Sequence, residues 1–66
     1  MKTTELSDRE IQVLELCAQG ETSPEIGKKL KISSHTVSTH KRNIMDKLRA
    51  ESMAASVYKY FVKGAG

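Results

Sequence analysis

Four helix-start signals divide this chain of 66 residues into short segments, and their spacing constrains the fold more than any other feature. The signals begin at Ser7, Thr22, Ser33 and Ser52. The first two are capping boxes, because Glu10 and Glu25 follow three residues later and can accept from the amide of the capping residue. Pro24 falls in the first turn of the second segment, where a missing N–H costs nothing. Starts this close together leave room for short helices joined by short loops.

The apolar residues of the first segment recur at the spacing of a helix face that is buried. Ile11, Leu14 and Ala18 are predicted to form this face. Gly20 is a natural C-terminal stop, and Gly64 is expected to end the last helix in the same way. No strand pattern interrupts the series of helices. We therefore predict an all-α domain over residues 1–66, with four helices at about 8–19, 23–30, 34–48 and 53–63.

The third helix is predicted to bury a stripe of Val37, Ile44 and Leu48. His40 lies within this stripe, and two roles remain open for it. A phosphate contact or a pH sensor is one, and a packed, partly buried residue at the junction of the helices is the favoured one. His35 and His40 lack a Cys or a second carboxylate at ligand spacing, so we expect no zinc site and no other metal.

Composition excludes several classes of protein. The single Cys17 cannot form an internal disulfide, so a reduced compartment, the cytoplasm, is expected, with Cys17 as a small core residue. No apolar run approaches the roughly 20 residues that span a bilayer. No phosphate-binding loop, catalytic triad or metal cluster is visible, so we expect neither an enzyme nor a cofactor. The chain is either a whole small protein or the excised end of a larger one.

Charge is segregated along the chain. Residues 1–27 carry a net charge of −4, residues 28–49 carry +6 and the remainder carries +1. The positive block coincides with the second and third predicted helices. A basic helix pair with an acidic region elsewhere is typical of a surface that binds a polyanion. The alternative interpretation, a solvated charged face, is the commoner one for an arbitrary helix.

Two helices joined by a few residues, the second of them basic, suggest a helix-turn-helix. On the third helix the side opposite the buried stripe presents His35, Ser38, Arg42 and Arg49, with Thr39 at its margin. Arg binds guanine O6 and N7 in a bidentate manner, and Ser and Thr donate or accept flexibly. Four lysines are placed to meet phosphates on either side of a groove. These are Lys28, Lys29, Lys41 and Lys47.

Five segments in order then match a known family at its spacing. They are LSDREIQVL from Leu6, TxxEI from Thr22, LKIS from Leu30, TVxxHxxNI from Thr36 and KL from Lys47. Together they make the chain resemble, over roughly residues 5–63, the LuxR-type helix-turn-helix domain, also called NarL/FixJ or GerE type. The resemblance implies a four-helix bacterial DNA-binding domain whose third helix enters the major groove. Many members are output domains of phosphorylation-controlled response regulators.

The resemblance also assigns residues. The base-reading positions of the family fall on Ser38, Thr39 and Arg42, although the family usually has Lys or Arg where this chain has Ser38. Expected backbone contacts are Lys28, Lys29, Ser34, Thr36, Lys41 and Lys47. The family commonly has Ala at the position of Gly27, and glycine there lowers helix propensity by about 0.5–1 kcal/mol.

The fourth helix is predicted to have two faces. Ala54, Val57 and Phe61 are expected to cover the core, with Met53 and Tyr60 beside them. Ala55, Tyr58 and Val62 would be partly exposed, and the family's fourth helix often mediates dimerisation. Exposed apolar residues on a small domain mark a partner surface. The alternative is that they extend a thin core.

We therefore predict sequence-specific binding of double-stranded DNA in transcription regulation. The expected partners are duplex DNA and, weakly, a second copy through the fourth helix, with RNA polymerase as a further candidate and no membrane. The rival function is a helical protein-interaction module whose basic face docks an acidic partner. Binding to random duplex that depends on salt separates the two.

Overall fold

The computed structural model describes residues 6–63 and is all-α over that range, as predicted. Its elements are α1 (Asp8–Ala18), α2 (Ser23–Leu30), α3 (Ser34–Leu48), α4 (Met53–Val57) and a π-helical continuation of α4, η1 (Tyr58–Val62). The first helix ends one residue earlier than predicted, since Gln19 is its C-cap. The last helix ends at Val62 instead of residue 63, and the predicted stop at Gly64 lies outside the described residues.

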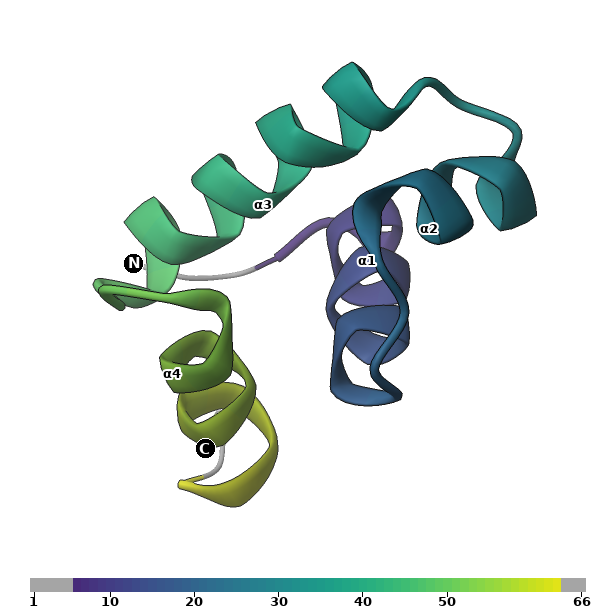
Figure 1. Ribbon diagram of the computed structural model, residues 1–66. Coiled ribbons are helices and arrows are strands. Elements are labelled where there is room, and N and C mark those ends of the chain that lie inside the picture. The colour runs from purple at the N-terminus through teal and green to yellow at the C-terminus, as the bar shows by residue number, and fades with distance from the viewer. Residues whose placement is uncertain (1–5, 64–66) are drawn as a thin grey trace.

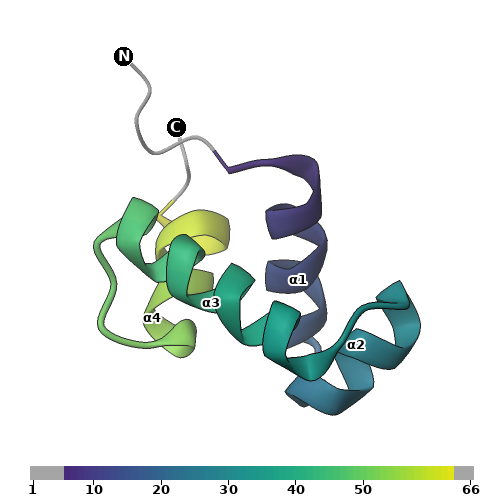
Figure 2. The same cartoon turned by 90° about the horizontal axis from the view of Figure 1, so that it is seen from above.

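Helix α3 lies across the other helices (Figures 1 and 2). It packs on α2 near its N-terminus, on α1 in its middle and on α4 near its C-terminus. Helices α1 and α4 lie side by side beneath α3 and contact each other (Figure 1). This arrangement leaves the outer side of α3 uncovered along its length.

The core is small and aliphatic, with residues from the first three helices at its centre. Its buried apolar members are Leu6, Val13, Leu14, Ile26, Val37 and Ile44. The predicted stripe of α3 is confirmed for Val37 and Ile44, while Leu48 is half-buried and packs against the cluster. In α1 Leu14 is fully buried and Ile11 is half-buried, but the prediction for Ala18 was wrong, because Ala18 is exposed.

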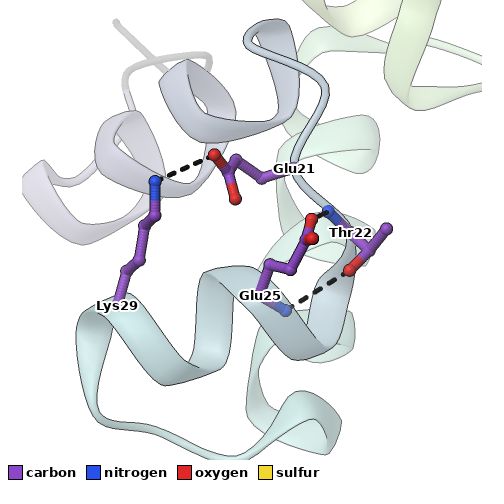
Figure 3. A network of polar contacts seen from close by, with 4 residues as sticks. All are labelled: Glu21, Thr22, Glu25 and Lys29. Atoms are coloured by element: carbon purple, nitrogen blue, oxygen red, sulfur yellow. Dashed lines mark hydrogen bonds and ion pairs between the residues drawn. The ribbon is translucent and has the colours of Figure 1, made fainter.

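Both predicted capping boxes are present. At α1 the Ser7 amide donates to Glu10 Oε1 at 2.9 Å, and the Glu10 amide donates to Ser7 Oγ at 3.2 Å. At α2 the Thr22 amide donates to Glu25 Oε1 at 2.7 Å, and the Glu25 amide donates to Thr22 Oγ1 at 3.3 Å (Figure 3). Ser33 and Ser52 cap α3 and α4 through single bonds to backbone amides, as predicted. Local hydrogen bonds therefore set where each helix begins.

The turn between α2 and α3 packs so closely on Gly27 that there is no room for a side chain at that position. Gly27 is buried, and an added Cβ would lie 2.6 Å from the carbonyl oxygen of Ile32. The Gly27 carbonyl in turn accepts from the Ile32 amide at 2.9 Å. Lys31 caps α2 in the left-handed conformation, with φ of 59°. Glycine at this position therefore lets the turn close tightly onto α2, which fixes the angle at which α3 leaves.

The prediction for the core face of the fourth helix was partly wrong. Ala54 and Phe61 are exposed, whereas Ser56 is fully buried. Burial of Ser56 is tolerated because its hydroxyl donates to the Ser52 carbonyl at 3.0 Å. From Tyr58 on, the chain turns as a π-helix, with the Lys63 amide bonded to the Tyr58 carbonyl. Phe61, which is 44% exposed, lies within this π-helical stretch.

Candidate nucleic-acid interface

The outer side of α3 carries a shallow hollow of about 280 Å³. Its lining residues are His35, Ser38, Thr39 and Arg42, all of them exposed and all from α3. The Thr39 hydroxyl donates to the His35 carbonyl at 3.2 Å, within the same helix. The structure thus brings together the three residues predicted to contact bases. It adds His35, which lies on the predicted face but was not among the predicted contacts.

No other element of residues 6–63 lines this face. Within residues 6–63 the guanidinium of Arg42 forms no ion pair, and no other helix lines the hollow. Arg42 therefore keeps its full set of donors for an external acceptor. Arg and Ser side chains on one exposed helical face suit the acceptors in the major groove of DNA.

The four lysines predicted to meet phosphates differ in what holds them. Lys29 Nζ lies 2.8 Å from Glu21 Oε2, an ion pair between α2 and the loop before it (Figure 3). Lys47 Nζ lies 2.8 Å from Glu10 Oε1. Lys41 Nζ donates instead to a neutral partner, Ser23 Oγ, at 2.7 Å. Lys28 is exposed and makes no side-chain hydrogen bond within residues 6–63. Two of the four charges are therefore already compensated by carboxylates.

The pair of Glu10 and Lys47 joins the start of α1 to the last turn of α3. Burial by itself would raise the pKa of the Glu10 carboxyl, but hydrogen bonds from Lys47 and Ser7, together with the charge of Lys47, hold it below its usual value. The side chain of Glu10 is 6% exposed and that of Lys47 is 36% exposed. The sequence indicated only the capping role of Glu10, because nothing local links residues that are 37 positions apart.

Two further predicted backbone contacts lie at the start of α3. Ser34 is the first residue of the helix and is exposed. Thr36 is half-buried, and both its amide and its hydroxyl contact Ser33 Oγ, at 3.0 and 2.9 Å. The hydroxyl of Ser34 therefore faces solvent more openly than that of Thr36. Their role toward DNA stays a prediction.

A second surface lies on η1. Tyr58, Phe61 and Val62 are 55%, 44% and 65% exposed, whereas Ala55 is half-buried. Phe61 leans on Tyr60 in an edge-to-face contact, with ring centres 5.1 Å apart. Phe61 was predicted to cover the core, and it lines instead a hollow together with Glu15, Ala18 and Gln19.

The remaining candidates behave as packing residues. Cys17 is half-buried against the core, and burial raises the pKa of its thiol while the charge of Lys41 lowers it. His40 is half-buried, and its Nδ1 is enclosed with no hydrogen-bond partner within residues 6–63.

The described residues contain no group of His, Cys, Asp and Glu that would hold a metal ion. None of the helices described here is long and apolar enough to span a bilayer.

A helix pair with a tight turn, whose second helix presents Arg and Ser outward, defines the class: a helix-turn-helix domain that binds DNA. The sequence comparison agrees with this class. Residues 4–60 match the family described as bacterial regulatory proteins, luxR family, and the chain belongs to that family. It is accordingly a DNA-binding domain of the kind found in transcription regulators.

Three relatives illustrate the similarity. The transcriptional regulatory protein LiaR of Bacillus subtilis is 43% identical over 56 residues, which are 83% of this chain and 26% of that protein. The oxygen regulatory protein NreC of Staphylococcus carnosus is 47% identical over 47 residues, or 71% of this chain and 22% of that protein. The uncharacterized response regulatory protein YgeK of Escherichia coli is 46% identical over 48 residues, which are 73% of this chain and 33% of that protein.

The chain thus spans about a quarter to a third of the curated relatives it matches. No solved structure matches it. The similarity therefore concerns this helical domain, and not the remaining three quarters to two thirds of those longer proteins.

Proposed function

We propose that this domain reads a specific duplex sequence with the outer face of α3 in the major groove. The observation that carries the proposal is the exposed hollow lined by Ser38, Thr39 and Arg42 on a helix that the other helices cover from one side only. In this arrangement Arg42 donates to a guanine edge, while Ser38 and Thr39 contact neighbouring bases. Side chains that line one hollow reach adjacent base pairs without any rearrangement of the fold.

Phosphate contacts flank this face. Lys28 and Lys41 supply uncompensated positive charge on either side of the α2–α3 turn, and Ser34 adds a hydroxyl at the helix start. Lys29, Lys47 and Thr36 are engaged within the chain, so they contribute less to phosphate binding. Phosphate contacts position the domain, and the base contacts of α3 select the site.

The domain acts as part of a regulator in the bacterial cytoplasm, either as the output domain of a response regulator or as a regulator on its own. Similarity to proteins named as response regulatory and transcriptional regulatory proteins supports this assignment. Two copies pair weakly through Tyr58 and Val62 on a two-fold-symmetric site, with Ala55 at the edge of the contact. RNA polymerase is a further partner of such a regulator.

Selection from a pool of random duplexes, followed by sequencing and binding at several salt concentrations, tests the proposal. We expect one enriched motif, and an affinity that falls as salt rises because counterions are released from neutralised phosphates. Failure to bind any duplex, together with binding to an acidic protein, would instead support a protein-interaction module.

A further inference from the structure

A lysine occupies a left-handed backbone position in the turn between α2 and α3. Lys31 is the C-cap of α2, with φ of 59° and ψ of 44°. Glycine is the usual residue at such a position, because a side chain raises the energy of the left-handed conformation. Lys31 is exposed and was not among the residues predicted to contact DNA. A lysine in a conformation that is costly for lysine points to a use for its side chain at this place.

The backbone of this turn is fixed by hydrogen bonds to one carbonyl group. The Gly27 carbonyl accepts from the amide of Lys31 and, at 2.9 Å, from the amide of Ile32. Gly27 has no room for a Cβ, so the turn lies directly against α2. The backbone of Lys31 is therefore held in place before any ligand binds, and binding has to order its side chain alone.

The charge of Lys31 is uncompensated. Lys31 makes no ion pair and no side-chain hydrogen bond within residues 6–63. The sequence from residue 26 to residue 45 contains no Asp or Glu. Lys28, three residues earlier on α2, is exposed as well. An anionic group that approaches the turn therefore meets two exposed ammonium groups and no carboxylate from this stretch of the sequence.

The turn also lies where a helix-turn-helix domain meets the DNA backbone. In such domains the first helix crosses the backbone, and the N-terminal residues of the second helix contact base edges. Lys31 stands between these two helices, and Figure 1 shows the turn at the end of α3 that is remote from α4. Ser34, the first residue of α3, is about 6 Å along the helix axis from Ser38, which is half the roughly 12 Å width of the major groove. With Ser38 in the groove, the turn before Ser34 is near the groove edge, where the phosphates lie.

We infer that Lys31 binds a DNA phosphate at the edge of the groove that α3 enters. The inference rests on the proposed function, because it adds a backbone contact beside the base contacts of α3. A phosphate contact carries no sequence information and fixes the position of a protein on the duplex. Lys31 therefore strengthens binding to every duplex alike, and this effect depends on salt.

The test uses Lys31→Gly, which removes the charge and suits the left-handed backbone. Urea unfolding followed by circular dichroism should show a domain as stable as the wild type or more stable. Fluorescence anisotropy then measures binding to the selected duplex and to a scrambled duplex of the same composition, at about 0.05 to 0.3 M salt. We expect the slope of log affinity against log salt to flatten by about 0.9, and both affinities near 0.1 M salt to fall by a similar factor of about fivefold to tenfold.

Two further variants at the same position complete the test. Lys31→Asn is a second neutral variant that tolerates the left-handed backbone, and it should behave like Lys31→Gly. Lys31→Arg keeps the charge and should keep the slope of the wild type. If the wild-type domain bound neither duplex at any salt concentration, the proposed function itself would fail.

Arg49→Gly is the matched control. Arg49 is also an exposed cation in the left-handed conformation, as the C-cap of α3 with φ of 54°. It lies at the other end of α3, and Asp46 and Glu51 flank it in the sequence. We expect Arg49→Gly to change the salt slope by less than half as much as Lys31→Gly. An unchanged slope in folded Lys31→Gly, a change no larger than that of Arg49→Gly, or a loss confined to the selected duplex would overturn the inference.

Discussion

The two sides of α3 differ in how their polar residues are used. On the outer side, His35, Ser38 and Arg42 line a hollow and make no ion pair within residues 6–63. On the side that meets α1 and α2, Lys47 is paired with the carboxylate of Glu10, whereas Lys41 donates to the neutral hydroxyl of Ser23 and keeps its charge uncompensated. The comparison shows that the positive block of this sequence is not one uniform surface. Part of its charge holds α3 in place, and part of it is left for a ligand.

The largest expected effect is a loss of stability when the pair of Glu10 and Lys47, which joins α3 to α1, is removed. Glu10→Gln removes the carboxylate that caps α1 and pairs with Lys47, and leaves the ammonium group without its partner. We expect the free energy of unfolding to fall by about 2–3 kcal/mol, below the full cost of breaking a buried pair because Lys47 is partly hydrated. Urea unfolding followed by circular dichroism measures this loss.

Glu25→Gln is the matched control, because Glu25 occupies the same position in the second capping box. Its side chain is exposed, and within residues 6–63 it forms no ion pair with a lysine of another helix. We expect a much smaller loss of stability than for Glu10→Gln. Equal losses would mean that the local cap, and not the pairing with α3, accounts for the effect.

Arg42→Ala should have the largest effect on the outer side. Since Arg42 is exposed and unpaired within the described chain, the variant should keep its stability. We expect it to lose roughly 1–3 kcal/mol of binding free energy on the selected duplex and much less on a scrambled one. Fluorescence anisotropy with both duplexes measures the difference. Equal losses on both would reassign Arg42 to the phosphate backbone.

Acid should lower the stability of the fold by protonating Glu10 and so breaking its pair with Lys47. The pKa of Glu10 is lower in the folded chain than its ordinary value, so the pairing stabilises the fold above the ordinary range of a carboxyl group. That stability is lost as the pH falls through the lowered pKa. Thermal unfolding measured from about pH 7 to pH 2 should show the loss, and Lys47→Met should reduce it. An acid dependence that is unchanged in a folded Lys47→Met variant would contradict this role of the pair.

The salt dependence of DNA binding should separate the lysines that are paired with carboxylates from those that are not. Each neutralised phosphate contributes about −0.9 to the slope of log affinity against log salt. We expect Lys28→Ala and Lys41→Ala each to flatten the slope by close to this amount and to weaken binding to all duplexes alike. Lys29→Ala and Lys47→Met should change it less, because carboxylates already compensate these charges. A full change of slope for Lys47→Met would show that its pair with Glu10 opens on DNA.

A change in η1 is expected to have the smallest effect on stability and on the affinity for one half-site. Tyr58 is more than half exposed, so Tyr58→Glu should leave the helical content and the binding to a single half-site near those of the wild type. We expect cooperative binding to two adjacent half-sites to be lost, as measured by gel shift. Unfolding of the variant would make Tyr58 a core residue, and cooperativity in a folded variant would place the pairing surface elsewhere.

Local features of this chain were predictable and distant ones were not. The capping boxes at Ser7 and Thr22 followed from residues three positions apart, and the buried stripe of Val37 and Ile44 followed from helical periodicity. The pair of Glu10 and Lys47 has no local signal, because it exists only once α3 has packed on α1. The π-helical stretch Tyr58–Val62 was not predicted, because helical periodicity in a sequence describes a regular period of 3.6 residues. The three residues predicted to contact bases, Ser38, Thr39 and Arg42, line one hollow in the structure, and their contacts stay predictions.

Mapping the duplex onto the domain by nuclear magnetic resonance tests the central claim most directly. The selected duplex is added to isotopically labelled domain, and the contacts between protein protons and base protons are recorded. The account predicts contacts from the side chains of Ser38, Thr39 and Arg42 to bases in the major groove, while Lys47 stays paired with Glu10. Base contacts that arise from η1 or α1, with the outer face of α3 unaffected, would contradict it.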